Sequence, residues 1–177
     1  HFLKTHNAIC TINGNKFTDE FNTKAAIYVV RDPRNIISSL THHYELSLNE
    51  AYDFLLNKRK IIFPVKGKEF NFLSDWSGHY NSWKNIDFFS IKIVKYEDLI
   101  KNTKDIFISI LDFLSKFMHL RIDQDKIFNA IDSTKFENLS KMEDKGAFNE
   151  SVVSSKTNKK IKFFNLGKKN DWRLSLD

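Results

Sequence analysis

Tyr28-Val-Val-Arg-Asp-Pro-Arg-Asn-Ile-Ile-Ser-Ser-Leu40 is the stretch of this 177-residue chain that decides its fold. The apolar run at 26–30 predicts a buried strand, which ends in a sharp turn at 32–34. Proline is tolerated in the first turn of a helix, so the turn leads into a helix whose apolar residues share one face. Arg31 then lies at the carboxyl end of a core strand, and Ser39 lies a little over one turn inside the helix. Strand ends that feed helix N-termini bind anions in open α/β sheets, so this pair is a candidate phosphate clamp.

The rest of the chain alternates between patterns of strands and patterns of helices. Ser47 and Glu50 form a predicted capping box that begins the next helix. Further helices are expected at residues 70–83, 103–118, 123–131 and 136–142, and further strands at 2–5 and 88–95. Loops are expected at 7–22, with a weak extended piece, and at 58–68, and the chain turns polar at 144–162. The alternation of strand and helix predicts a parallel α/β sheet.

Composition narrows the class of protein. The formal net charge is +6, which favours anionic ligands and leaves nucleotides, nucleic acids and acidic surfaces open. Cys10 is the single cysteine and cannot form an internal disulfide, so we expect a reducing cytoplasm. No apolar run approaches the ~20 residues of a membrane span, and no signal peptide is visible. The chain begins at His1 without Met, within a run that is typical of the middle of a strand, so we expect a fragment without its natural N-terminal part.

Four separated parts of the sequence carry polar motifs. They are Lys4-Thr5-His6, the run Arg31–Ser39, the strand end Tyr96-Glu97-Asp98-Leu99, and the C-terminal pieces Ser133–Phe136 and Phe164–Trp172. In this order and spacing they resemble the nucleotide-dependent sulfotransferase family, whose members use 3′-phosphoadenosine 5′-phosphosulfate (PAPS). The resemblance implies an α/β fold with a P-loop-kinase-like parallel sheet flanked by helices, in a single domain over residues 1–177.

The resemblance also implies that part of this fold is missing. In the family, the first strand and the 5′-phosphosulfate loop precede the Lys-Thr-His motif, and nothing before His1 is present to form them. A phosphate cradle of backbone amides cannot be replaced by a few side chains. We therefore expect an exposed part of the sheet, weak nucleotide binding and an inactive fragment.

The first two motifs imply the phosphate site and the catalytic base. By resemblance, Arg31 and Ser39 bind the 3′-phosphate, and the chemistry agrees because a guanidinium gives phosphate a bidentate pair of donors. His6 matches the general base that deprotonates the acceptor hydroxyl, a role that suits a group with a pKa near neutrality. Lys4 matches the cation that neutralises charge on the transferred group or the leaving phosphate.

The remaining motifs imply the adenine pocket and a covering loop. Tyr96 matches the aromatic residue that lines the pocket, and Thr134 and Phe136 match residues that flank the adenine. Glu97 and Asp98 are expected to bind backbone amides, which is a structural role.

The family's Arg-Lys-Gly-x-x-Gly-Asp-Trp loop, which closes over the 3′-phosphate, is only partly matched here. Gly167 is retained, and the family's Arg-Lys pair is replaced by Asn-Leu. Lys168 and Lys169 could compensate from the other side of this glycine. Asn170 replaces the second glycine, and since asparagine tolerates positive φ, we expect it to preserve the turn.

The favoured function is transfer of a sulfuryl group from PAPS to a hydroxyl or amine of a small-molecule, glycan or peptide acceptor. The six His and one Cys show no metal-ligand spacing, so no metal is expected. One alternative is a P-loop-type nucleotide kinase or other phosphotransferase of the same architecture. Another is a basic module that binds nucleotides or nucleic acid through the C-terminal lysines, which is less favoured because such lysines usually form a solvated face. Sequence leaves the acceptor and the oligomeric state open.

Overall fold

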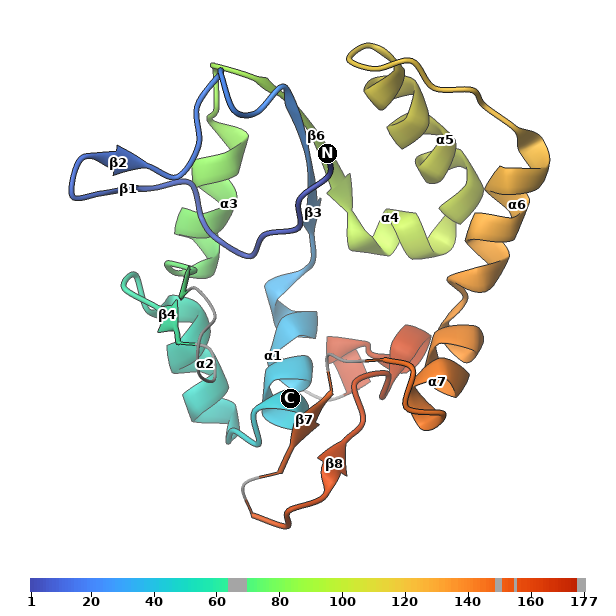
Figure 1. Cartoon of the computed structure of the whole chain (residues 1–177). Coiled ribbons are helices and arrows are strands. Elements are labelled where there is room, and N and C mark those ends of the chain that lie inside the picture. Colours follow the sequence, from blue (N-terminus) through green and yellow to red (C-terminus); the bar gives the residue numbers. More distant parts are fainter. Residues whose placement is uncertain (64–69, 149–150, 155, 175–177) are drawn as a thin grey trace.

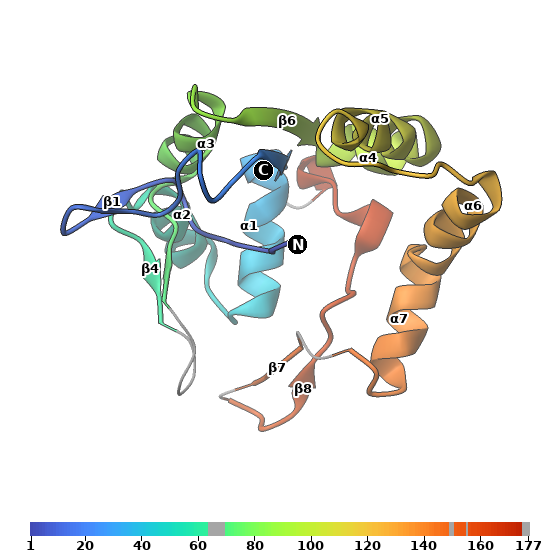
Figure 2. The same cartoon turned by 45° about the horizontal axis from the view of Figure 1, so that its top comes forward.

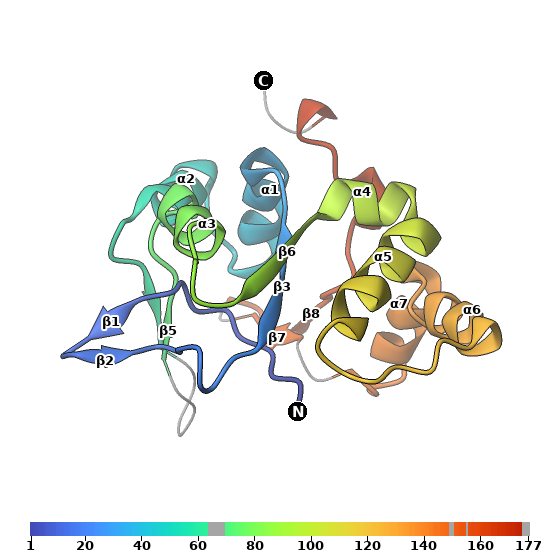
Figure 3. The same ribbon diagram turned by 90° about the horizontal axis from the view of Figure 1, so that it is seen from above.

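The computed structural model describes residues 1–63, 70–148, 151–154 and 156–174. Two groups of helices lie on either side of a short parallel sheet (Figures 1 and 3). In chain order the elements are β1 (Thr11–Ile12), β2 (Asn15–Lys16), β3 (Ala25–Val30), α1 (Pro33–His43), α2 (Leu48–Leu56), β4 (Ile61–Ile62), β5 (Asn71–Phe72), α3 (Trp76–Lys84), β6 (Ser90–Lys95), α4 (Tyr96–Lys101), α5 (Thr103–Ser115), α6 (Gln124–Ser133), α7 (Phe136–Asp144), β7 (Val152–Val153), β8 (Lys160–Ile161), and the 3-10 turns η1 (Gly167–Lys169) and η2 (Trp172–Leu174).

The central sheet consists of β3 and β6, which pair in parallel with Ala25 opposite Ser90 and Val30 opposite Lys95. The predicted parallel α/β arrangement is therefore confirmed. Because the two strands end at the same edge, the residues that follow them, Arg31 and Tyr96, leave the sheet side by side. This edge carries the candidate functional site.

The prediction that β3 is buried is wrong. Its residues are half-buried, and Val29 is 50% exposed. Within the described parts of the chain the parallel sheet has two strands, so one strand edge of β3 lacks a neighbour. The expected exposure of part of the sheet is thus confirmed.

The first of the two groups of helices is built around α1. Asp32 caps this helix by accepting a hydrogen bond from the backbone of Arg34, and Pro33 occupies its first turn, as the sequence predicts. Ile37 and Leu40 are buried against Ala51 of α2. These contacts fix the direction in which α1 leaves the sheet.

Most predicted helices are present with shifted ends. The predicted capping box of Ser47 and Glu50 begins α2. The helix predicted at 70–83 begins only at Trp76, because Asp75 caps it and the preceding residues form β5, which pairs with β4. The apolar face of α5 is half-buried rather than a full core, and Phe117, predicted to belong to it, lies beyond the helix end and is 41% exposed.

The short elements near the N-terminus and in the polar region match the sequence predictions only in part. Residues 2–5 form no strand, and Leu3 is 93% exposed, since no strand among the described residues lies beside it to pair with. The extended piece at 7–22 is the hairpin β1–β2, whose turn residues Asn13 and Gly14 both have positive φ, as a tight two-residue hairpin requires. The polar region contains a second hairpin, β7–β8, which the sequence does not predict.

The C-terminal segment returns from β8 toward the start of α1, passing between α1 and α7 (Figure 2). Glu143 at the end of α7 is buried and accepts hydrogen bonds from the backbone amides of Phe163 (2.6 Å) and Phe164 (2.9 Å). The helix thereby holds the segment that leads into η1. The predicted loop at 58–68 lies partly outside the described residues. Among the described residues, every helix falls short of the length and apolarity that a membrane crossing requires.

Candidate functional site

A cavity of about 250 Å³ opens at the edge where β3 and β6 end. Its walls come from the start of α1, from α4 and from the segment around η1. The lining residues are Arg31, Asn35, Tyr96, Glu97, Ile100, Lys101, Gly167 and Asn170. Two cationic side chains and one carboxylate therefore face a small space beside a helix N-terminus, an arrangement that suits an anion with an attached ring.

The backbone carbonyl and the guanidinium face of Arg31 have partners in the structure, whereas its Nε has none among the described residues. Its carbonyl accepts a hydrogen bond from the indole of Trp76 (3.3 Å), and its guanidinium lies over the ring of Tyr96, 4.5 Å from the centroid. Its Nη1 reaches the hydroxyl of Ser39 over a longer distance of 3.4 Å. Its Nε is buried and has no hydrogen-bond partner among the described residues. A buried donor without a partner costs about 1–3 kcal/mol, so this atom favours binding of a hydrogen-bond acceptor.

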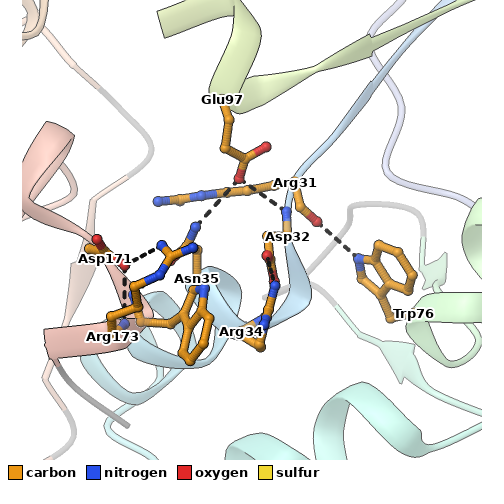
Figure 4. Close-up of polar contacts among 9 residues, drawn as sticks. Arg31, Asp32, Arg34, Asn35, Trp76, Glu97, Asp171 and Arg173 are labelled. Atoms are coloured by element: carbon orange, nitrogen blue, oxygen red, sulfur yellow. Dashed lines mark hydrogen bonds and ion pairs between the residues drawn. The ribbon is translucent and has the colours of Figure 1, made fainter. Parts of the chain in front are cut away.

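Glu97 and Asp32 serve the framework of the cavity (Figure 4). The Glu97 carboxylate accepts from the backbone amide of Asp32 (3.1 Å) and from the side chain of Asn35 (3.4 Å), which ties α4 to the start of α1. The structural role predicted for Glu97 is confirmed. The hydrogen bond from the Arg34 guanidinium, together with its charge, holds the pKa of Asp32 below its usual value. The Asp32 carboxylate is engaged by Arg34, whereas the Glu97 carboxylate, bound through Oε1, also lines the cavity and places one negative charge on its wall.

The segment that covers the cavity, residues 164–172, requires a glycine at position 167. Gly167 has φ +54°, and a Cβ added there would lie 2.8–2.9 Å from three ring atoms of Phe136. Phe136 in turn packs edge-on against Phe164, with ring centroids 5.9 Å apart. Farther along, the Trp172 amide donates to the side chain of Asn35 (2.9 Å). The segment is thus fixed to α7 at one end and to α1 at the other.

Asn170 makes the central contacts of this cover. Its amide nitrogen donates to the carbonyl of Asn35 (3.0 Å) and to the hydroxyl of Ser39 (3.1 Å), while its oxygen accepts from Ser38. Its φ is −75°, so the prediction that it preserves a turn by adopting positive φ is wrong. The residue holds the turn through its side chain instead.

One helix connects this cavity to the N-terminal motif. On α3, His79 lies three residues after Trp76, which corresponds to a rise of about 4.5 Å. Its Nε2 contacts the carbonyl of His6 (3.1 Å), and its Nδ1 contacts the hydroxyl of Tyr28 (2.9 Å). A carbonyl can only accept, so Nε2 carries the proton and Nδ1 accepts from Tyr28. Burial lowers the pKa of His79 and raises the pKa of Tyr28 to about 12, which keeps both groups neutral.

Comparison with known proteins identifies the family. The whole chain, residues 1–177, matches the sequence profile of the sulfotransferase domain. The chain belongs to this family. It is 26% identical over 143 residues to luciferin sulfotransferase of Photinus pyralis, a match that covers 78% of this chain and 35% of that protein. Its fold is similar to the crystal structure of mouse sulfotransferase SULT7A1 complexed with PAP, with a TM-score of 0.58, 18% identity, and coverage of 87% of this chain and 52% of that one.

These matches confirm the resemblance seen in the sequence and the α/β sulfotransferase fold. The chain spans about a third of the length of its curated relative and about half of the solved structure.

The structure brings together part of the residue set predicted for this sulfotransferase domain. Arg31, Tyr96 and Gly167 line the cavity, and Ser39 contacts Arg31 at its edge. Phe136 lies directly beneath Gly167 without being among the lining residues.

Other predicted residues lie outside the cavity. The hydroxyl of Thr134 donates to the carbonyl of Ala130 (2.7 Å) at the end of α6. Lys169 is exposed and does not line the cavity, while the side chain of Lys168 is outside the described part of the structure. Lys4 and His6 lie on an exposed segment that reaches the rest of the site through α3. The expected compensation by Lys168 and Lys169 is thus not seen for the one side chain that is described.

Sequence reasoning missed the lining residues Asn35, Ile100 and Lys101, and it gave Asn170 a role in the turn rather than in the cavity wall. Lys101 lies four residues after Glu97 and therefore on the same face of α4, so helical spacing could have found it. Asn35 and Asn170 could not be paired in this way, because 135 positions separate them.

Proposed function

We propose that this sulfotransferase domain binds PAPS through its 3′-phosphate at Arg31 and supports transfer of the sulfuryl group to a hydroxyl or amine. The observation that carries the proposal is the buried Arg31 Nε without a partner, at the edge of a cavity beside a helix N-terminus. A solved sulfotransferase of similar fold is described as a complex with PAP, the product left when PAPS loses its sulfuryl group, which supports the same ligand class.

The residues present fit a nucleotide that carries a 3′-phosphate. Arg31 supplies charge-assisted donors, and Ser39 adds a hydroxyl to the same anion. Lys101 provides a second cation at the cavity wall. Tyr96 offers an aromatic ring next to the phosphate position, which suits an adenine. Gly167 lines the cavity, so its backbone N–H is a further candidate donor.

The chemical step then depends on the N-terminal motif. PAPS, when bound, supplies the sulfuryl group and is left as PAP. His6 accepts the proton of the attacking hydroxyl at its imidazole, and Lys4 neutralises negative charge that develops during transfer. The contact from His79 to the carbonyl of His6 fixes the backbone of the base relative to the strand that ends in Arg31. Acceptors of this reaction are small molecules, glycans or peptides.

Isothermal titration calorimetry tests the nucleotide assignment. The 177-residue chain is titrated at millimolar ligand with PAP, with adenosine 5′-monophosphate (AMP), which lacks the 3′-phosphate, and with ATP and Mg²⁺. We expect PAP to bind weakly, because the 5′-phosphosulfate loop is expected to be missing, but more tightly than AMP. In Arg31→Ala the affinity for PAP falls by about tenfold or more, since a hydrogen bond to a charged group contributes about 1.5–3 kcal/mol. Arg121→Ala, an exposed arginine remote from the cavity lining, is the matched control.

Two results would count against the assignment. Absence of PAP binding at millimolar ligand, or binding that is indifferent to Arg31→Ala, would remove the phosphate site. Preference for ATP with Mg²⁺ over PAP would favour a nucleotide kinase of the same architecture.

A further inference from the structure

The hydroxyl of Ser39 has an unusual set of neighbours. A serine hydroxyl has one proton to donate and two lone pairs that accept. Arg31 Nη1 approaches this oxygen at 3.4 Å and Asn170 Nδ2 at 3.1 Å, and both are N–H donors. Both lone pairs therefore face donors, so the hydroxyl can interact with a further group only by donating its own proton.

The orientation of the Asn170 amide is fixed by its other contacts. The carbonyl of Asn35 can only accept, so the atom 3.0 Å from it is the NH₂ group. The hydroxyl of Ser38 donates to Oδ1 on the opposite side of the amide. With both N–H bonds and the oxygen engaged, Asn170 cannot rotate without losing three hydrogen bonds. Its second N–H is therefore held toward Ser39.

The proton of Ser39 is only weakly held. Its acceptor in the structure is the carbonyl of Asn35, at 3.5 Å, which is at the limit of a hydrogen bond. The same carbonyl already accepts from Asn170 at 3.0 Å. An anion in the cavity would offer a stronger acceptor, since hydrogen bonds to ionised groups are about twice as strong as neutral ones. The proton is thus available to a ligand at little cost.

We propose that Asn170 is a positioning residue that makes Ser39 a committed hydrogen-bond donor and so confers selectivity for nucleotides with a 3′-phosphate. The inference rests on the proposed function, because it takes the anion at Arg31 to be that phosphate. Asn170 acts through Ser39 and also ties the covering segment to α1 without a cationic side chain. The covering segment therefore contributes to phosphate recognition through the side-chain amide of Asn170 rather than through a cationic side chain.

The ratio of PAP affinity to AMP affinity measures this role. A residue that only stabilised the fold would change both affinities together, whereas a residue acting on the 3′-phosphate changes PAP alone. In Asn170→Ala we expect PAP affinity to fall about tenfold, the equivalent of one well-placed hydrogen bond, with AMP affinity unchanged. In Asn170→Asp the fall is larger, because a carboxylate takes the Ser39 proton for itself and adds negative charge beside the phosphate.

Calorimetry with the wild-type chain and four variants separates the possible outcomes. Asn170→Gln retains the amide and is expected to recover part of the PAP preference. Asn129→Ala, at an exposed position on α6 that does not line the cavity, is expected to behave as wild type. Urea unfolding of each variant confirms that it is folded at the temperature of the titration. An Asn170→Ala chain that is folded and keeps the wild-type ratio overturns the role of Asn170. Equal loss of PAP and AMP binding also overturns it, while absence of a PAP preference in the wild type refutes the proposed function itself.

Discussion

Replacing Gly167 by alanine tests the covering segment directly. An alanine at φ +54° costs about 1–2 kcal/mol, because its Cβ crowds the backbone in the left-handed region. The same Cβ would lie 2.8–2.9 Å from the Phe136 ring, and the ring cannot move freely because Phe164 packs against it. Forcing an extra methyl group into such a contact costs about 1–3 kcal/mol. We therefore expect Gly167→Ala to lower the free energy of unfolding by about 2–5 kcal/mol.

Gly146→Ala is the matched control for this change. Gly146 has φ +75°, but an added Cβ would meet nothing within 4 Å. Both variants restrict the unfolded chain equally, so the difference between their unfolding free energies in urea isolates the contact with Phe136. We expect that difference to be about 1–3 kcal/mol. Equal losses in the two variants would refute the close packing of Gly167 on Phe136.

Three further changes test other parts of the structure. Ser47→Ala removes the capping box of α2 and should lower the unfolding free energy in urea by about 1 kcal/mol. Glu143→Gln leaves one of two buried backbone amides poorly paired and should cost about 1–3 kcal/mol, whereas Glu137→Gln, exposed on the same helix, should cost little. Burial lowers the pKa of His79 in the folded chain from its usual value of 6.5. As the pH falls through 6.5, the unfolded state therefore protonates at this histidine before the folded state does, and the free energy of unfolding falls. His79→Gln should flatten this fall in urea titrations from pH 7.5 to 5, and an unchanged slope would contradict it.

Local sequence patterns predicted the elements that lie next to the site. The apolar run before Arg31, the proline after it and the spacing of Ile37 and Leu40 gave the strand, the turn and α1 because each is determined by neighbouring residues. The capping box at Ser47 is equally local. Strands of two residues, as in β7–β8, carry no periodicity and were therefore not predicted. Burial of β3 was overestimated, since it depends on which strands lie beside it.

The site was predicted where it rests on motifs and missed where it rests on long-range polar contacts. Arg31, Tyr96 and Gly167 were found through the family resemblance and lie together in the cavity. The Asn170 network could not be predicted, because its geometry depends on how the covering segment meets α1. The φ of Asn170 shows the same limit, since the local preference of asparagine for turns yielded to its side-chain hydrogen bonds.

A structure of the chain with PAP bound tests the central claim most directly. The account predicts a 3′-phosphate oxygen within about 3 Å of the Arg31 guanidinium, including Nε, and within the same distance of the Ser39 hydroxyl. A phosphate bound elsewhere, with Arg31 Nε still lacking a partner, would contradict it.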